Sequence, residues 1–213
     1  MNKKFIVKKI IETLLKEYEN PVCTLEYNKP YELLFATILA AQSKDSMVNK
    51  ITKDLFSKYN TLEKFAKANI NELESEIKAI GFYRNKAKNI IETANILINK
   101  YSGNLPDNIE ELIKLKGVGR KTANVILANI FDIPSIIVDT HCMRLSKRLG
   151  ITKHSDPEKI EKELRDIIPK KYYTIFSNLM VYHGRKICMA KKPRCNICSI
   201  NQYCEYYKNF KHG

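Results

Sequence analysis

Four cysteines near the end of the chain have the spacing of a metal site. Cys188, Cys195, Cys198 and Cys204 fall within 17 residues in the pattern C-x6-C-x2-C-x5-C. In a reducing compartment such a group is more typical of a metal site than of disulfides. Four thiolates can hold either Zn²⁺ or a [4Fe–4S] cluster. Zinc ribbons usually have two C-x2-C pairs, so the single pair and two longer gaps favour the cluster, with structural zinc or thiols that bind no metal as the alternatives.

Three cations lie between the first two of these cysteines. Lys191, Lys192 and Arg194 would sit on a short loop that the metal holds in place. Such a loop is suited to contacts with a phosphate backbone. The alternative is a solvated charge run without a partner.

A second candidate site is the segment LKGVGRKTA (115–123), in which a Gly-x-Gly turn leads directly into an expected helix. Gly117 and Gly119 allow a tight turn that leaves backbone N–H groups facing outward. The dipole of the following helix adds to their attraction for anions. The flanking residues match the helix-hairpin-helix motif, which binds DNA without reading its sequence.

The overall charge agrees with a nucleic-acid partner. The chain of 213 residues has 37 Lys and Arg against 23 Asp and Glu, a net charge of +14. Such an excess is typical of proteins that bind polyanions. The abundance of Lys, Ile, Asn and Tyr leaves the compositional bias of an A/T-rich coding sequence as a partial explanation.

The composition excludes several other classes of protein. With 44% apolar residues and only 7 Gly and 7 Pro, the chain is neither collagen-like nor wholly disordered. Its longest apolar run, residues 33–41, is half the length that spans a bilayer. The N-terminus begins like a signal peptide, but Lys8, Lys9 and Glu12 interrupt the apolar stretch. We therefore expect a cytoplasmic protein without a membrane anchor.

Apolar residues recur at helical spacing along almost the whole chain, which predicts an all-α fold of about ten short helices. Residues 31–41 are apolar on nearly every side and predict a fully buried helix. Leu73, Ile77 and Ile80 predict a helix that Gly81 ends. Asp107 and Glu110 have the spacing of a capping box, which would begin a further short helix.

The best candidate for a domain boundary is the segment DIPS (132–135). The chain beyond it is richer in Lys and Arg and carries the clustered cysteines. We expect one helical domain over residues 24–132, which contains the Gly-x-Gly turn. A second domain would combine residues 1–23 with residues 133–213.

Taken together and in order, these motifs resemble those of the endonuclease III family of DNA glycosylases and abasic-site lyases. The resemblance rests on the segments AAQSKD (40–45), LKGVGRKTAN (115–124), VDTH (138–141) and HGR (183–185) with the cysteine pattern, and it extends from about residue 30 to 206. It implies a two-lobed helix-hairpin-helix fold with a [4Fe–4S] cluster. It also implies removal of oxidised pyrimidines through a lysine Schiff base, followed by β-elimination. The implied partner is duplex DNA with damaged bases or abasic sites, bound by a monomer.

The resemblance also implies roles for particular residues. Lys121 falls at the position of the family's nucleophilic amine, and Asp139 at that of its catalytic carboxylate. Gln42 and Phe82 fall where the family fills the space left by a flipped nucleotide. The cleft between the lobes is the expected lesion site, with Lys121 on one wall and Asp139 on the other. The remaining expected DNA contacts are Gly117, Gly119, Arg120, Lys191, Lys192 and Arg194, and the expected cluster ligands are Cys188, Cys195, Cys198 and Cys204.

The sequence departs from the family pattern at three positions. Lys116 replaces a common proline, Ala40 replaces a serine, and Phe82 replaces a leucine. None of these residues is the proposed amine or carboxylate. The departures bear instead on the rigidity of the hairpin loop and on lesion preference.

Other functions and other residue roles stay open at this point. The rival functions are a monofunctional mismatch glycosylase, a non-enzymatic DNA-binding metal protein and an electron-transfer iron–sulfur protein. Considered alone, Lys121 could be a phosphate contact and Asp139 a helix N-cap. We expect His183 to support the cluster loop. A surface patch for phosphate is one possible role for Arg144, Lys147 and Arg148, which share a helix face.

Overall fold

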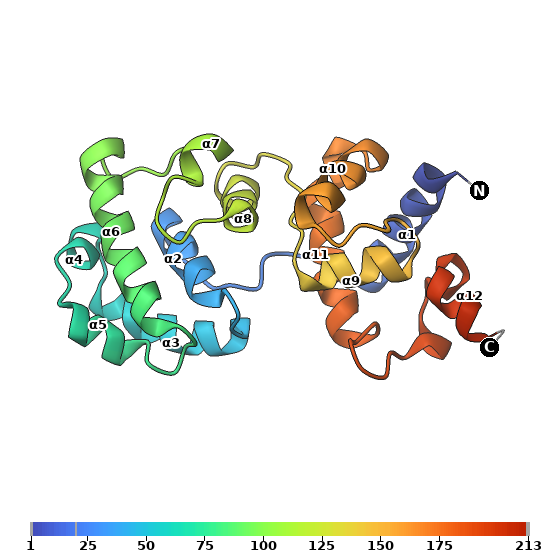
Figure 1. Ribbon diagram of the computed structural model, residues 1–213, viewed down its shortest axis with the longest axis horizontal. Coiled ribbons are helices and arrows are strands. Elements are labelled where there is room, and N and C mark those ends of the chain that lie inside the picture. The colour runs from blue at the N-terminus through green and yellow to red at the C-terminus, as the bar shows by residue number, and fades with distance from the viewer. Residues whose placement is uncertain (1, 20, 212–213) are drawn as a thin grey trace. The chain divides into compact units, whose positions relative to one another are not determined.

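The computed structural model describes residues 2–19 and 21–211, and every regular element within them is a helix (Figure 1). This confirms the predicted all-α fold. The α-helices are α1 (Lys3–Glu17), α2 (Pro30–Ala40), α3 (Asp45–Lys58), α4 (Leu62–Ala66), α5 (Ile70–Glu76), α6 (Tyr83–Tyr101), α7 (Ile109–Leu112), α8 (Arg120–Ile130), α9 (Thr140–Arg148), α10 (Pro157–Ile167), α11 (Tyr173–Lys186) and α12 (Glu205–Lys211). Three 3₁₀ turns are η1 (Lys170–Tyr172), η2 (Cys195–Ile197) and η3 (Asn201–Tyr203). Among the described helices, none is long and apolar enough to cross a membrane.

The chain divides into two compact units. The first, Cys23–Ile133, contains α2 to α8. The second combines Met1–Val22 with Pro134–Gly213 and contains α1, α9 to α12 and the 3₁₀ turns. In Figure 1 the first unit runs from blue through green, and the second joins the blue N-terminal helix to the orange and red segments.

Helix α2 is the centre of the unit Cys23–Ile133. Every residue from Glu32 to Ala40 is buried, because the helix is apolar on nearly all sides and α3, α6 and α8 pack around it. This confirms the buried helix predicted for residues 31–41, except that Tyr31 is half-buried and Ala41, just beyond the end of the helix, is exposed. The two helix ends that matter for the site are the C-terminus of α2, close to Gln42, and the N-terminus of α6, next to Phe82.

Helix α4 was not predicted, because five residues are too few to show a helical period. Thr61 caps its N-terminus by accepting a hydrogen bond from the backbone amide of Lys64. Phe65 then fills the space between α4 and its neighbours. Its ring centroid lies 4.8 Å from that of Phe35 and 5.1 Å from that of Tyr59. The signal for α4 was therefore its cap and its buried aromatic rather than a repeat.

Two predicted helix boundaries were wrong. Helix α5 ends at Glu76, and the backbone amide of Ile80 bonds the carbonyl of Ile77, three residues back, so this stretch is a series of turns. The N-cap of α7 is Asn108, whose side chain accepts a hydrogen bond from the amide of Glu111, 2.9 Å away. Asp107 stands one residue too early for that bond.

The unit that joins the two chain ends has its own apolar core. Helix α1 contributes Val7, Ile10 and Leu14, which pack with Phe176 and Leu179 of α11. The segment between α8 and α9 is extended, and α11 holds it in place. The amide of Ile137 donates a hydrogen bond to Oγ of Ser177, 2.8 Å away. This attachment places Asp139 at the start of α9.

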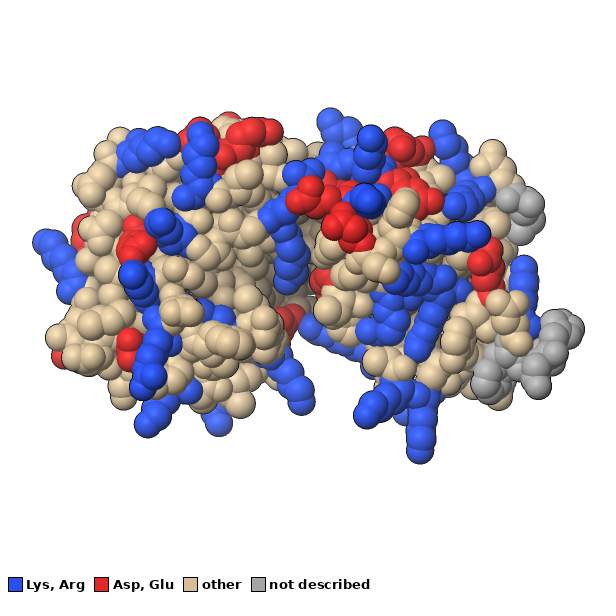
Figure 2. Space-filling view, in the orientation of Figure 1, with Lys and Arg blue, Asp and Glu red and all other residues tan. Residues whose placement is uncertain are grey.

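Positive charge is concentrated in this second unit. It holds 21 of the 37 Lys and Arg residues and 10 of the 23 Asp and Glu residues. Figure 2 shows blue side chains gathering over its visible face, whereas the other unit is largely tan with scattered charges. The basic excess of the sequence is therefore mainly a property of the cysteine-rich unit.

Candidate functional site

The hairpin before α8 presents backbone groups at the surface. Gly117 has a φ of +75°, which favours glycine, and a Cβ there would lie 2.7 Å from Nδ2 of Asn89, so that side chain would have to shift. The carbonyl of Lys116 accepts a hydrogen bond from Oγ1 of Thr93, 3.0 Å away. Leu115 and Val118 are buried on the inner side. These contacts anchor the loop where the proline of the family pattern is missing.

Gly119 is the N-cap residue of α8 and makes no side-chain cap bond. Apart from its chain neighbours, no described residue lies within 4 Å of the place a Cβ would take. The first amides of α8 are thus accessible to a ligand, and the helix dipole favours an anion there. The hairpin therefore has the geometry of a phosphate site built from the backbone.

Lys121 lies in the first turn of α8 and is exposed. Within the described residues its amine makes no hydrogen bond and no ion pair. The next residues, from Thr122 to Ala128, are buried against α2 and α7. The helix is consequently held firmly while the amine at its beginning faces outward. An amine in this position can act as a nucleophile or contact a phosphate.

Asp139 is the N-cap of α9. Its Oδ1 accepts a hydrogen bond from the backbone amide of Cys142, 2.7 Å away. The capping role weighed for this residue in the sequence is therefore present. The residue before it, Val138, is buried, so Asp139 stands where the chain passes from core to surface. A half-buried carboxylate with one oxygen engaged can still transfer a proton through the other.

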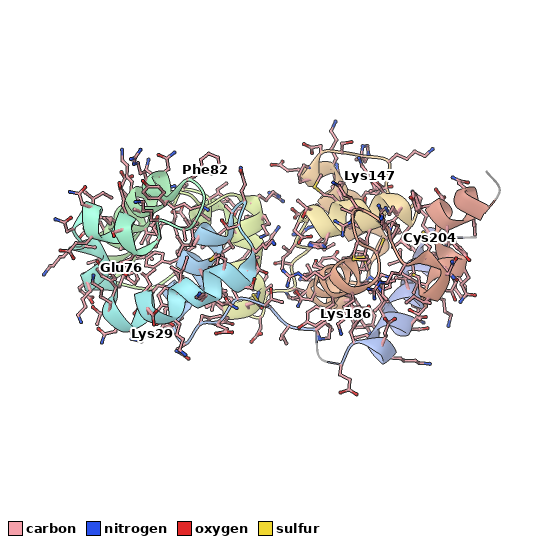
Figure 3. The ribbon with its side chains drawn as sticks, turned by 90° about the horizontal axis from the view of Figure 1, so that it is seen from below. Lys29, Glu76, Phe82, Lys147, Lys186 and Cys204 are labelled. Carbon is pink, nitrogen blue, oxygen red and sulfur yellow. The ribbon has the colours of Figure 1, made fainter. Side chains whose placement is uncertain are left out.

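Gln42 and Phe82 share an unusual backbone conformation. Their φ values are +57° and +58°, in the left-handed region that residues other than glycine rarely adopt. Both side chains are exposed, and Phe82 is 65% exposed, which is high for a phenylalanine. Figure 3 shows Phe82 at the surface of its unit. Exposed side chains on strained backbone are typical of functional positions.

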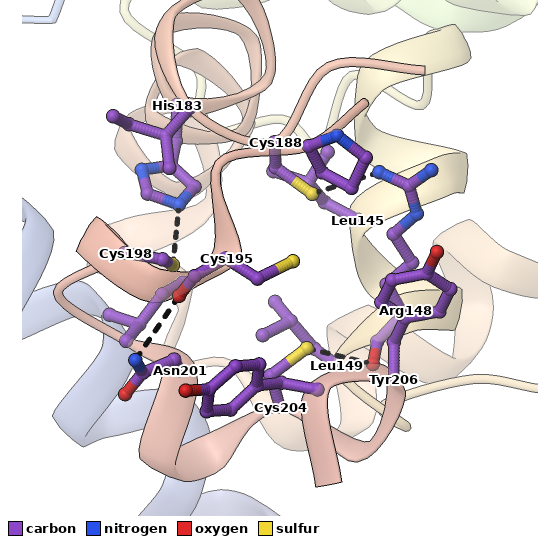
Figure 4. A pocket seen from close by; sticks show the side chains of 14 residues that line it. Leu145, Arg148, Leu149, His183, Cys188, Cys195, Cys198, Asn201, Cys204 and Tyr206 are labelled. Carbon is purple, nitrogen blue, oxygen red and sulfur yellow. Dashed lines mark hydrogen bonds between the residues drawn. The ribbon is translucent and has the colours of Figure 1, made fainter. Parts of the chain in front are cut away.

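Cys188, Cys195, Cys198 and Cys204 line one cavity (Figure 4). The rest of its lining is largely apolar and includes Leu145, Leu149 and Ile200. No group of three or more His, Cys, Asp or Glu side chains in the described residues is arranged around a single metal ion. The sulfurs instead surround a space, which is the arrangement that a larger inorganic cluster needs. The donor set and the apolar wall therefore fit an iron–sulfur cluster.

Three side chains contact the sulfurs of this cavity or its backbone. The guanidinium of Arg148 donates to Sγ of Cys188 at 3.2 Å, and Nε2 of His183 lies 3.2 Å from Sγ of Cys198. Nδ2 of Asn201 donates to the carbonyl of Cys195. The contact of His183 with Cys198 supports the role expected for this histidine, which stays a prediction. Burial raises the pKa of the Cys198 thiol to about 11, so iron binding must displace a proton there.

The loop from Cys188 to Cys195 carries its three cations at the surface. Lys191, Lys192 and Arg194 are all exposed, and the amide of Arg194 closes the loop on the carbonyl of Ile187. Arg148 donates hydrogen bonds to the carbonyls of Met189 and Ala190, at 2.7 and 3.0 Å. The first residues of the cationic loop are therefore bonded to Arg148, the last residue of α9.

The phosphate patch considered for α9 is not formed by these side chains. Arg144 bonds the carbonyls of Gly184 and Cys188, and Arg148 bonds the cysteine loop. Lys147 donates to Oγ of Ser155. The two arginines stabilise neighbouring segments because backbone carbonyls lie within their reach, whereas Lys147 bonds a serine hydroxyl. Sequence spacing could show that they share a face but not what that face covers.

One supporting residue was missed altogether. Lys86 in α6 is only 5% exposed, and its ammonium donates to the carbonyls of Leu39 and Ala41, at 2.9 and 2.6 Å. Burial lowers its pKa. The only signal in the sequence was a lysine next to the apolar stripe of the helix, which is ordinary for a surface lysine.

Family models and curated relatives that match the chain represent DNA repair proteins. Residues 35–170 match the family described as HhH-GPD superfamily base excision DNA repair proteins, and residues 188–204 match the iron-sulfur binding domain of endonuclease III. Endonuclease III of Rickettsia prowazekii (strain Madrid E) is 48% identical over 204 residues, which cover 96% of each chain.

Two solved structures are similar over the whole fold. One is a non-covalent endonuclease III–DNA complex, with a TM-score of 0.95, 41% identity and full coverage of both chains. The other is a trapped endonuclease III–DNA covalent intermediate, an estranged-adenine complex. It has a TM-score of 0.94 and 42% identity, and the match covers 99% of this chain and 100% of that one.

Proposed function

The chain belongs to the endonuclease III family, and on this premise we propose which residues perform its chemistry. It is a bifunctional DNA glycosylase and abasic-site lyase of base excision repair. We propose that Lys121 is the nucleophile, that Asp139 is the catalytic carboxylate and that the substrates are oxidised pyrimidines of the thymine glycol type. The observation that carries the proposal is the exposed Lys121 at the start of α8, directly after the Gly117–Gly119 turn.

Duplex DNA would be held mainly through its backbone. The amides at the start of α8 would bind one phosphate, with Gly117 and Gly119 allowing close approach and Arg120 adding charge. The exposed cations Lys191, Lys192 and Arg194 would bind others. Neither contact reads bases, which suits an enzyme that must scan any sequence for damage.

The damaged base must leave the helix before it can react, because its sugar is inaccessible inside the duplex. Unstacking a base costs a few kcal/mol. Gln42 and Phe82 would occupy the space left behind and offset part of that cost. Their exposure and left-handed backbone support this role.

The reaction then follows from the amine. Nζ of Lys121, in its neutral form, attacks the anomeric carbon of the sugar, and the bond to the damaged base breaks with the electron pair leaving on the base. Loss of a proton from the nitrogen and opening of the sugar ring give an imine between lysine and sugar. The imine acidifies the proton on the adjacent carbon, and its removal expels the 3′ phosphate by β-elimination. Asp139 would transfer protons and stabilise the positive charge of the opening sugar.

The chain carries a [4Fe–4S] cluster. We propose Cys188, Cys195, Cys198 and Cys204 as its ligands, since these are the sulfurs that line the cavity of Figure 4. When bound, the cluster supplies structural support, because neither base release nor β-elimination transfers an electron. Its effect on DNA binding would come from fixing the loop that carries Lys191 and Lys192.

DNA is the partner of the family, and the finer description is part of the proposal. We propose that the chain acts as a monomer on duplex DNA with damaged bases or abasic sites. We also place it in the cytoplasm with the chromosome. The spacing of Cys188, Cys195, Cys198 and Cys204, which is typical of a metal site rather than of disulfides, supports a reducing compartment.

Borohydride trapping tests the proposal directly. The protein is incubated with duplexes that contain thymine glycol, an abasic site or an adenine–8-oxoguanine pair, with and without borohydride. Reduction converts an imine into a stable amine link, so we expect a covalent adduct and strand cleavage with the first two duplexes. Lys121→Gln should lose both with thymine glycol and still bind DNA.

A matched control is Lys114→Gln, which removes an exposed lysine of the same region that pairs with Glu111. It should trap like the unmodified protein. Undiminished trapping of thymine glycol DNA by Lys121→Gln would refute the role of Lys121. Activity on the adenine–8-oxoguanine pair alone would instead indicate a mismatch glycosylase.

A further inference from the structure

Lys86 is a buried cation that the chemistry above does not use. It is the fourth residue of α6, and its Nζ donates hydrogen bonds to the carbonyls of Leu39 and Ala41. These carbonyls stand at the C-terminal end of α2, where backbone acceptors lack partners within the helix. The negative end of the helix dipole lies there as well, which favours a cation.

The same residue is connected to both proposed insertion side chains. Ala41, whose carbonyl lies 2.6 Å from Nζ, directly precedes Gln42. The backbone amide of Lys86 donates to the carbonyl of Phe82, 3.1 Å away. One residue therefore links the turn after α2 to the turn before α6. Both turns and both helices belong to the unit Cys23–Ile133.

Those two turns need such support because each contains strain. A non-glycine residue in the left-handed region costs about 1 kcal/mol or more and persists only where its surroundings fix it. Gln42 and Phe82 are exposed, so their own side chains have few contacts that could fix them. The support must come from the backbone on either side, where Lys86 makes its bonds.

We propose that Lys86 is a positioning residue for nucleotide flipping. By bonding the end of α2 from within α6, it presents Gln42 and Phe82 together, in the conformation in which they can enter the duplex. An apolar residue of similar size could fill the same volume but would remove the donor from the buried carbonyl of Leu39 and from the partly buried carbonyl of Ala41. This inference rests on the proposed insertion of Gln42 and Phe82 and concerns a residue to which the proposed function gives no role.

The test compares a substrate that needs insertion with one that does not. Base release from thymine glycol in a duplex requires the hole to be filled, whereas β-elimination at an abasic site in a single strand uses Lys121 and Asp139 but leaves no hole to fill. Lys86→Met should slow single-turnover base release from the duplex about ten- to a hundredfold, the scale expected when a reacting group is misplaced. The single-strand lyase rate should change less than about twofold, and it also shows that the unit with Lys121 is folded.

Further variants separate positioning from general stability. Lys86→Arg keeps the donors and should recover part of the duplex rate. Lys88→Met removes an exposed lysine of the same helix that pairs with Glu92, and it should leave both rates unchanged. In a protein that already carries Gln42→Ala and Phe82→Ala, adding Lys86→Met should slow base release from the duplex only slightly further. The side chains through which Lys86 acts are then absent.

Several outcomes would overturn the inference. One is an equal fall of the duplex and single-strand rates in Lys86→Met. Another is that Lys86→Met slows duplex base release as much in the protein with Gln42→Ala and Phe82→Ala as it does in the unmodified protein. If Lys86→Met does not fold, Lys86→Gln, which keeps one donor group, is measured in the same way. The same comparison applies to it: the duplex base-release rate should fall much more than the single-strand lyase rate. Failure of the proposed function itself would look different, since the unmodified protein would then release no thymine glycol and form no adduct.

Discussion

Asp139 caps α9 by accepting a hydrogen bond at Oδ1 from the backbone amide of Cys142. The carboxylate proposed for catalysis therefore also stabilises a helix, and the two roles use different properties of the side chain. A cap needs an acceptor oxygen, which aspartate and asparagine both have. Proton transfer needs an ionisable group, which only aspartate has.

This difference makes Asp139→Asn a selective variant. The cap is kept, so the midpoint of thermal unfolding, followed by circular dichroism, should stay close to that of the unmodified protein. Base release from thymine glycol should slow by about two orders of magnitude or more, the usual contribution of an acid–base group. Single-turnover kinetics with a labelled duplex measure the rate.

The companion variant is Asp139→Ala, which removes cap and carboxylate together. Its free energy of unfolding should fall by about 1 kcal/mol, and its base release should slow as in Asp139→Asn. If Asp139→Asn releases the base as fast as the unmodified protein, Asp139 is only a helix cap. If both variants unfold at the same temperature, the capping bond contributes nothing measurable.

The cysteine ligands can be tested by iron content. Replacement of Cys188 or Cys204 by alanine should remove most of the iron and the broad visible absorbance of the cluster, because a [4Fe–4S] cluster requires four thiolates. Cys23→Ser lies outside the cavity and should keep about four irons per chain. Anaerobic preparation and metal analysis give the counts. Full iron content in the Cys204 variant, or zinc in place of iron, would contradict the assignment.

The residues proposed for chemistry could be predicted because each belongs to a short local pattern. The Gly117–Gly119 turn and Asp139 before its helix are recognisable within a few residues of sequence, and the four cysteines within 17. The all-α fold, the iron–sulfur cofactor and the repair function were confirmed. The roles of individual residues in that function stay predictions.

The supporting contacts could not be predicted, because they join residues far apart in the chain. Arg148 bonds the loop at Met189, and Lys86 bonds the end of α2 at Ala41. Helical periodicity assigns such long cations to a surface face, since it carries no information about which carbonyls lie near. The left-handed backbone of Gln42 also has no signal in the sequence, where glycine or asparagine would be expected.

Salt dependence tests the cationic loop. If the hairpin and the loop together contact about four to six phosphates, the slope of log affinity against log salt on undamaged duplex should be about −4 to −5. Replacing Lys191 and Lys192 by alanine should make the slope shallower by up to about 2. The control removes Lys170 and Lys171, an exposed pair in η1, and should leave the slope unchanged. Equal slopes in the unmodified protein and in both double variants would show that the loop does not contact DNA.

Cys142 provides a pH dependence whose sign is fixed by burial. Its side chain is fully buried, and burial raises the pKa of the thiol to about 12. In the unfolded chain the thiol ionises near pH 8.5. Between these values the unfolded state has released a proton that the folded state keeps, so stability falls as pH rises above about 8.5. The fall approaches about 1.4 kcal/mol per pH unit at most.

Cys142→Ala removes this group and is the variant to measure. It should start less stable at pH 7.5, because a small cavity replaces the sulfur. It should then lose less stability than the unmodified protein between pH 8 and pH 10. Thermal midpoints of the two proteins at matched pH values give the comparison, and groups common to both cancel in the difference. Parallel curves would mean that the thiol ionises as easily in the folded chain as in the unfolded one, and that burial at the start of α9 is incomplete.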